Sequence, residues 1–194
     1  MTYKSAPFGL TVVELLVTIS VISIIAVAGA PGIRNTIRQH RLTDQITAFV
    51  SALQLAQSEA IGRAKPVVVC ASGNAESATA ACGGGNIHWS DGWIVFVDPD
   101  NDGILDAGET IVRVSGPLTT GLQLNGSSGL GNAVTFDATG SLSIGGLLVL
   151  CDSSDFHYSR AVMLGSNGRI RLAPMDGNGI PVDDGGSEIT TCTP

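Results

Sequence analysis

The main apolar run of the chain covers residues 10–30, LTVVELLVTISVISIIAVAGA, and contains a single charged residue, Glu14. As a helix that rises about 1.5 Å per residue, this run is about 31 Å long, close to the hydrocarbon thickness of a bilayer. The pattern therefore predicts a membrane-spanning helix with a carboxylate near one end. An acid in such a helix usually has a partner. We interpret Glu14 as a group that receives a positive charge from another molecule, and the alternative is a plain anchor.

Beyond Pro31 the apolar residues recur at spacings of three to five, which predicts an amphipathic helix over residues 31–65. The apolar positions are Ile33, Ile37, Leu42, Ile46, Phe49, Val50, Leu53, Ala56 and Ala60. Gly62 and Pro66 provide the stop signal. Together with residues 10–30, this segment predicts one long helix whose second half packs on a globular head.

The pattern changes again in residues 66–194, where short β-branched runs alternate with Gly, Asn, Asp and Ser. This alternation predicts a head of antiparallel sheet, and the chain as a whole is expected to have an α+β fold. The expected strands are residues 67–71, 93–97, 110–114, 134–137, 147–151, 160–164 and 169–172. Residues 72–87 and 173–194 are poor in apolar side chains, and we expect both segments to be loose.

The formal net charge of −7 argues against bulk electrostatic attraction to nucleic acid or anionic lipid, but it leaves room for a local basic patch. Five of the acidic residues are concentrated between Asp98 and Glu109. The chain contains three histidines, and none accompanies a motif for acid–base or nucleophilic chemistry. We therefore do not expect an enzyme.

Four cysteines, an even number without metal-binding spacing, favour disulfides in an oxidising compartment. Three connectivities are possible. We favour Cys70–Cys82 and Cys151–Cys192, because each pair brackets a polar segment that is rich in turn residues.

The acidic segment fits a calcium-binding loop, D-x-D-x-D-G-x5-E, position by position. Its candidate oxygen ligands are Asp98, Asp100, Asp102, Asp106 and Glu109, and Gly103 stands at the turn. Strands rather than helices are predicted on both sides, unlike in an EF-hand. The two interpretations are a calcium site and a solvated acidic hairpin loop.

A second candidate site is Gly168-Arg169-Ile170-Arg171. On a strand, alternate side chains share a face, so both arginines are expected to point the same way, about 6–7 Å apart. That distance is close to the phosphate spacing of a DNA strand, and an arginine binds phosphate with two parallel hydrogen bonds. Arg160 is the only other basic residue after Arg113. The alternative is a solvated strand face, and the acids of residues 173–194 oppose binding unless that tail folds away.

The N-terminal residues Phe8-Gly9-Leu10-Thr11-Val12-Val13-Glu14 resemble the type III signal of type IV pilins and pseudopilins. The resemblance implies that a prepilin peptidase removes residues 1–9 by cutting after Gly9, and that the new N-terminus, Leu10, is methylated. It also implies that Glu14 pairs with the α-amino group of an adjacent subunit when the helices assemble. Leu10 departs from the usual phenylalanine, but it is apolar too.

Three further stretches, residues 55–60 (LAQSEA), 67–70 (VVVC) and 93–96 (WIVF), resemble the GspH/FimT group of minor pilins and pseudopilins. The G-R-x-R motif at residues 168–171 resembles the DNA-binding motif of FimT-type minor pilins. The resemblance implies a type IV pilin-like fold and a minor pilin that binds double-stranded DNA for uptake in natural transformation. The alternative is a GspH-like pseudopilin of type II secretion, or a ligand-free minor pilin that primes assembly. Either protein is expected in the inner membrane with its head in the periplasm, and a pilin moves on to the pilus at the cell surface.

Overall fold

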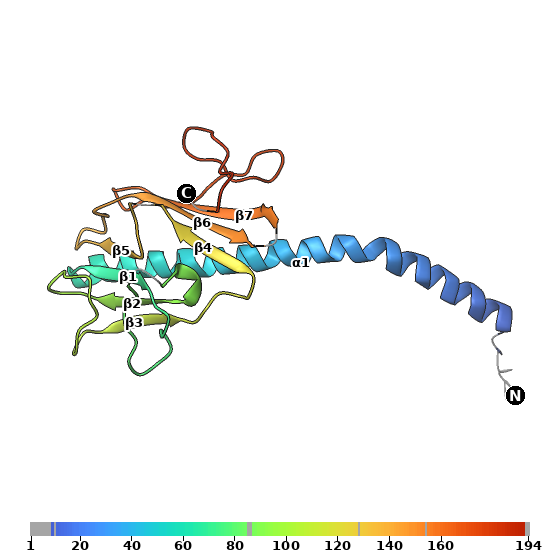
Figure 1. Cartoon of the computed structure of the whole chain (residues 1–194), viewed down its shortest axis with the longest axis horizontal. Coiled ribbons are helices and arrows are strands. Elements are labelled where there is room, and N and C mark those ends of the chain that lie inside the picture. Colours follow the sequence, from blue (N-terminus) through green and yellow to red (C-terminus); the bar gives the residue numbers. More distant parts are fainter. Residues whose placement is uncertain (1–8, 10, 85–86, 128, 154, 193–194) are drawn as a thin grey trace, which may run out of the picture. The chain divides into compact units, whose positions relative to one another are not determined.

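The computed structural model describes Gly9 and residues 11–84, 87–127, 129–153 and 155–192 (Figure 1). The predicted leader, apart from Gly9, and the predicted methylation site Leu10 lie outside the described residues. The chain divides into two compact units, one ending at Arg38 and the other beginning at Gln39, and each is described by itself. The helix α1 (Val12–Arg63) belongs to both units.

The first unit contains the N-terminal part of α1, which begins with a side-chain cap. The Glu14 N–H donates to the Thr11 hydroxyl over 3.2 Å, and Glu14 lies in the first helical turn, where an acid interacts favourably with the helix dipole. The apolar side chains from Val12 to Ile25 are exposed. Within the described residues, no helix is both long enough and apolar enough to cross a membrane. The membrane-spanning role expected of residues 10–30 is therefore not confirmed.

The second unit contains the rest of α1 and two four-stranded antiparallel sheets. The β1 sheet has the order β3-β2-β1-β5, and the β6 sheet has the order β4-β6-β7-β8. The strands are β1 (Val67–Ala71), β2 (Trp93–Val97), β3 (Ile111–Ser115), β4 (Leu122–Gly126), β5 (Ala133–Phe136), β6 (Gly146–Asp152), β7 (Asp155–Leu164) and β8 (Ile170–Leu172). A short 3-10 helix, η1 (Trp89–Asp91), precedes β2.

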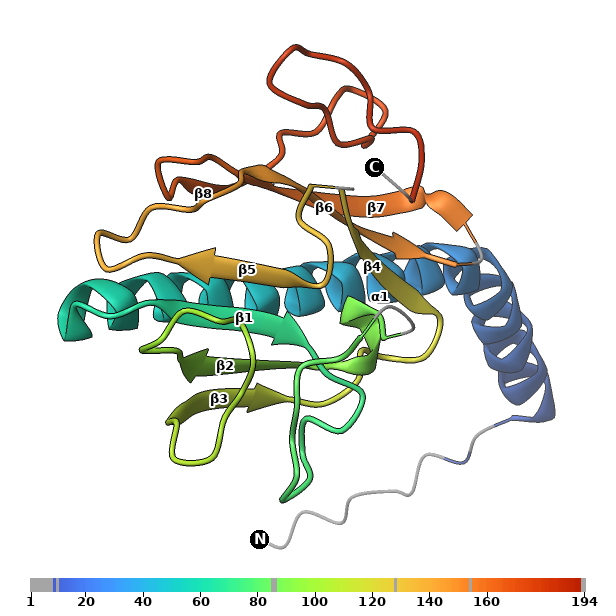
Figure 2. The same cartoon turned by 60° about the vertical axis from the view of Figure 1, so that its left-hand side comes forward.

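One core joins the helix to both sheets, and Figure 2 shows strands of each sheet beside α1. The predicted apolar stripe supplies the helical part of this core, with Leu42, Ile46, Phe49 and Leu53 fully buried. Phe49 meets the rings of Trp89 and Trp93 edge to face, with centroids 5.4 and 5.1 Å apart. The predicted α+β fold, with a helix packed on antiparallel sheet, is confirmed.

Each sheet has a second face that a disulfide-linked segment covers. Cys70 bonds to Cys82, and the segment between them packs on the outer face of the β1 sheet with Leu105 of the acidic loop. Cys151 bonds to Cys192, and Ile189 packs on the outer face of the β6 sheet. These bonds join the cysteine pairs that the sequence favours.

Among the described residues, four five-residue turns share one hydrogen-bonding pattern. In each, the first residue exchanges backbone hydrogen bonds with the fourth and the fifth, and the fourth is a glycine with φ between +78° and +82°. This geometry is a three-residue hairpin loop with a left-handed glycine. The turns are residues 137–141, 165–169, 176–180 and 183–187.

Two of these turns lie in the C-terminal segment, which is therefore not the loose tail that its composition predicts. Met175 bridges to Pro181 and Val182 bridges to Glu188, so residues 174–189 form two small hairpins in succession. They are the two loops drawn in red in Figure 1. Backbone hydrogen bonds, rather than apolar side chains, order this segment.

Candidate nucleic-acid interface

The G-R-x-R motif lies at the tip and on the second strand of the β7–β8 hairpin. Residues 165–169 form its turn, in which the Asn167 side-chain oxygen accepts a hydrogen bond from the Arg169 N–H over 3.1 Å. On β8, Arg171 pairs with Met163 of β7. Met163 belongs to the cluster on the outer face of the β6 sheet, so the Arg171 side chain is on that face as well.

Gln57 of α1 holds the tip of this hairpin by hydrogen bonds to two backbone carbonyl groups. The Gln57 side-chain amide donates to the carbonyl oxygens of Gly140 and Gly168, both over 2.8 Å. Gly168 has a φ of +78°, and a Cβ built there would lie 2.0 Å from the Gly140 oxygen. The glycine of the motif is therefore required by the close approach of two turns. Gln57 lies within the LAQSEA stretch of the sequence, but nothing in its spacing predicts this contact.

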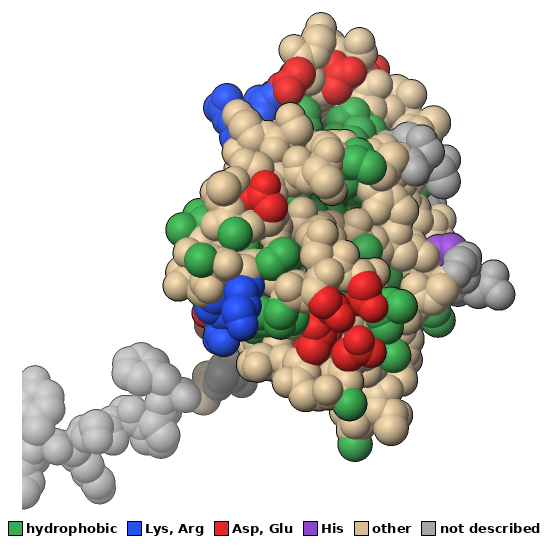
Figure 3. Space-filling model, turned by 90° about the vertical axis from the view of Figure 1, so that its left-hand side faces the viewer, with side chains coloured by type: hydrophobic (Ala, Val, Ile, Leu, Met, Phe, Trp, Pro, Cys, Tyr) green, Lys and Arg blue, Asp and Glu red, His purple; other side chains and the backbone are tan. Residues whose placement is uncertain are grey.

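A groove of about 830 Å³ lies beside the hairpin on the outer face of the β6 sheet. Its walls carry the two arginines of the motif together with two acids of the C-terminal segment. The residues that line the groove include Leu147, Met163, Asn167, Arg169, Arg171 and Asp184. Near the top of Figure 3, where the C-terminal segment projects, basic and acidic side chains adjoin one another. The groove is thus mixed in charge rather than basic.

Arg171 already has a carboxylate partner. Its guanidinium forms an ion pair with Asp184, whose side chain is 71% exposed, while that of Arg171 is 33% exposed. Among the described residues, no hydrogen-bond or ion-pair partner is found for the Arg169 guanidinium. The two arginines therefore share a groove but differ in availability.

Arg160 does not join this pair. On β7 it alternates with Ala161 and Met163 of the outer face and is in phase with Val162, which lies in the core beside the helix. Its guanidinium donates to the Gln39 side-chain oxygen over 2.5 Å and to the Ser159 carbonyl over 2.8 Å. Partial burial lowers the pKa of Arg160 below its usual value. The structure thus separates Arg160 from the other two arginines, with which the sequence groups it.

The acidic loop connects β2 to β3 and contains one buried acid. Asp98 is fully buried, and its carboxylate accepts backbone hydrogen bonds from Asn101, Asp102 and Gly103 over 2.8–3.3 Å. Carboxylate oxygens of Asp98, Asp100 and Asp102 lie within 4.8 Å of one another. Figure 3 shows a compact group of acidic side chains, in red, in the lower half of the view. Three of the five predicted calcium ligands are therefore close together.

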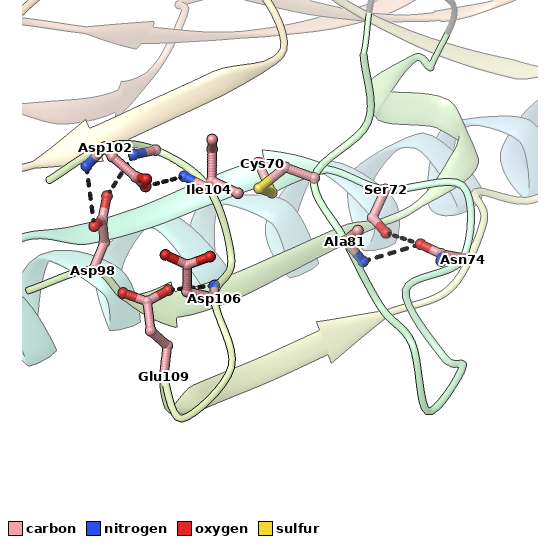
Figure 4. Close-up of a disulfide and its surroundings, with 11 residues drawn as sticks. Cys70, Ser72, Asn74, Ala81, Asp98, Asp102, Ile104, Asp106 and Glu109 are labelled. Atoms are coloured by element: carbon pink, nitrogen blue, oxygen red, sulfur yellow. Dashed lines mark hydrogen bonds between the residues drawn. A yellow bond between two sulfur atoms is a disulfide. The ribbon is translucent and has the colours of Figure 1, made fainter. Parts of the chain in front are cut away.

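The other two predicted ligands form a separate pair. In Figure 4, Glu109 reaches toward Asp106, whose N–H donates to its carboxylate over 2.9 Å. Desolvation raises the pKa of Glu109, and the neighbouring charges of Asp98, Asp100 and Asp106 add to this effect. Bringing all five carboxylates to one cation requires the loop to tighten. Calcium binding stays a prediction.

A sequence profile of the family described as type II transport protein GspH matches residues 45–168, nearly two thirds of the chain. Comparison with curated proteins gives no significant match. The type IV minor pilin FimU of Pseudomonas aeruginosa has a similar structure, with a TM-score of 0.53 and 20% identity over 70% of this chain and 90% of FimU. The minor pseudopilin EpsH from the type II secretion system of Vibrio cholerae gives a TM-score of 0.49 and 16% identity over 68% of this chain and 95% of EpsH.

The head shares its fold with the type IV minor pilin FimU. The chain belongs to the GspH family. The matched residues end at Gly168, so Arg169, Arg171 and the C-terminal segment all lie beyond them.

Replacing Gly168 with alanine is expected to lower the free energy of unfolding by about 3–4 kcal/mol. The left-handed backbone costs about 1–2 kcal/mol for an alanine, and the clash with Gly140 adds the loss of the Gln57 hydrogen bonds, each about 1 kcal/mol. Urea unfolding of the full chain in non-ionic detergent measures the change. Gly177→Ala is the matched control, since a Cβ at Gly177 has no neighbour within 4 Å. Equal stability of the two variants would contradict this role of Gly168.

If the loop binds calcium, titration of calcium into the full chain is expected to give a measurable heat of binding. Near saturation, calcium is expected to raise the melting temperature of the protein by several degrees. The cation would balance the charges that now raise the pKa of Glu109. The double variant Asp100→Asn with Asp102→Asn removes two exposed ligands and should abolish both effects. No heat, together with no change in melting temperature on adding a chelator, would rule the site out.

Proposed function

We propose that this protein is a minor type IV pilin that binds DNA through Arg169 and Arg171 for uptake in natural transformation. The observation that carries the proposal is the placement of both arginines at one groove on the outer face of the β7–β8 hairpin. Gln57 holds the tip of that hairpin against the helix, so the backbone that carries the arginines is held in place.

The chemistry of the groove suits phosphates rather than bases. Each guanidinium offers two parallel N–H groups to a phosphate. None of the described residues that line the groove is aromatic, so this part of the groove offers bases no surface for stacking. Contacts confined to the backbone of DNA position a duplex without reading its sequence. The proposed binding is accordingly weak, independent of sequence and sensitive to salt.

The partners in the proposal follow from the N-terminal half of the helix. Its exposed apolar side chains, from Val12 to Ile25, support packing against the helices of other pilins in a filament. Before assembly, the proposal has the prepilin peptidase cut after Gly9, with the protein held in the inner membrane and its head in the periplasm. Glu14, exposed in the first turn, then pairs with the methylated amino group of an adjacent subunit.

A second candidate is a pseudopilin of type II secretion, or a minor pilin without a ligand. The family is described as a type II transport protein, which favours the pseudopilin. In addition, Asp184 already provides an anionic partner for Arg171, so this arginine needs no DNA to balance its charge. In that case the hairpin has a structural role only.

The double variant Arg169→Gln with Arg171→Gln is expected to lower the affinity of the full chain for duplex DNA by more than tenfold, because it removes both phosphate contacts. The measurement is a fluorescence titration of a short blunt-ended duplex at low salt, with the protein in non-ionic detergent. The matched control, Arg41→Gln with Arg63→Gln, removes the same charge from the helix and should bind like the parent chain. If the two double variants bind equally well, the arginine site is excluded.

In cells, loss of the gene is expected to reduce natural transformation, and the Arg169→Gln, Arg171→Gln protein should fail to restore it. Transformation, twitching motility and type II secretion are scored in the same strains. A defect in secretion alone would replace the DNA-binding proposal with the pseudopilin alternative.

A further inference from the structure

The C-terminal segment lies against the sheet face that carries the arginine groove. Ile189 and Cys192 pack on the outer-face cluster that includes Val149 and Met163, and the disulfide to Cys151 joins the segment to β6. The Asn125 side-chain amide also donates to the Cys192 carbonyl over 2.9 Å. Because β8 runs directly into this segment, both of its ends are attached to the β6 sheet.

The second small hairpin of this segment contributes two acids, Asp183 and Asp184, to the lining of the groove. In its turn, residues 183–187, the Asp183 carboxylate accepts the N–H groups of Gly185 and Ser187 over 2.9 and 2.8 Å. Asp183 is therefore used to hold the turn. Asp184 follows it, and its carboxylate is the one that pairs with Arg171.

A carboxylate on this guanidinium occupies the donors that a phosphate would use. Both are oxygen anions, and Arg171 offers each of them the same planar set of N–H groups. An ion pair this exposed is weak, so a phosphate of a polyanion with a second contact at Arg169 can displace it. The ion pair between Arg171 and Asp184 then lowers the affinity of the groove for phosphate groups but does not prevent their binding.

We propose that Asp184 is a built-in competitor for the anion site, so that the C-terminal hairpin lowers the affinity of the groove for phosphodiester chains. The inference rests on the proposed DNA binding, because it assigns the regulation of that same site. In the resting head Arg169 makes the first contact, and Arg171 contributes after the carboxylate of Asp184 has left it.

Asp184→Asn tests this directly, since Asp184 is exposed and takes no part in the bonds that form its turn. The variant is expected to bind duplex DNA about three- to tenfold more tightly than the parent chain at low salt, because one opposing charge leaves and Arg171 becomes available. Asp44→Asn, which removes the same charge from an exposed position on the helix, should change the affinity by less than about twofold.

A cycle with Arg171→Gln separates competition from a general effect of charge. In the parent chain this substitution should weaken binding less than it does in the Asp184→Asn background, because Asp184 offsets part of the contribution of Arg171. In the Asp184→Asn background it should remove the whole gain in affinity. Melting temperatures of all four proteins confirm that each is folded.

Titrating heparin as a second polyanion, alongside duplex DNA, distinguishes failure of the Asp184 proposal from failure of the proposed DNA binding. If Asp184→Asn behaves like Asp44→Asn while Arg169→Gln with Arg171→Gln still abolishes DNA binding, the competitor is overturned and the proposed function stands. If the cycle holds for heparin but no variant binds DNA, the competitor stands and the proposed function is overturned. If no variant binds either polyanion, both are overturned.

Discussion

The head depends on one apolar stripe of the helix that two sheets bury together. Leu42, Phe49 and Leu53 are fully buried among strands of the β1 sheet and the β6 sheet, and the same cluster includes both tryptophans. Neither sheet has a core of its own on that face. Whatever the outer faces carry, the helix is the element against which both sheets are positioned, and Gln57 extends this anchoring to the backbone of two turns.

The segments that pack on the outer faces of the two sheets, here called their covers, expose different polar groups. Over the β1 sheet, the acidic loop packs a partly buried Leu105, buries Asp98 and leaves its remaining carboxylates near solvent. Over the β6 sheet, the C-terminal segment buries Ile189 and places an acid on an arginine. Each cover therefore combines an apolar contact that holds it with polar groups that are available for binding. In a chain with a formal net charge of −7, the proposed anion site therefore has one of its two arginines paired with an acid of the same chain.

Much of the architecture follows from the sequence pattern, because periodicity reports which residues face a core. The helical stripe, seven of the eight strands and both disulfide pairs are all visible in the spacing of apolar residues, glycines and cysteines. The strand β4 is missed, since its sequence, LQLNG, has only two apolar residues and ends in turn formers. It forms because it pairs with β6 at an edge, which is a long-range contact that no local pattern reports.

The candidate site was only partly predictable for the same reason. Alternation along a strand places Arg169 and Arg171 on one face, but it does not say which face Arg160 of the neighbouring strand takes. That depends on the register between β7 and β8, in which Arg171 stands opposite Met163. Gln57 lies 83 and 111 positions from its two partners, Gly140 and Gly168. Asp184 lies more than ten positions from Arg171, and neither contact has a signature in the sequence.

The two disulfides also differ in the length of chain that each one closes. Cys70 and Cys82 are 12 residues apart, whereas Cys151 and Cys192 are 41 apart and meet on a face that exists only after β6 and β7 have paired. A longer loop costs more entropy to close, and here the closing contact also waits for a finished sheet. The longer bond therefore removes more conformational freedom from the unfolded chain than the shorter one, so the cover over the arginine groove depends more on an oxidising compartment than the cover over the β1 sheet does.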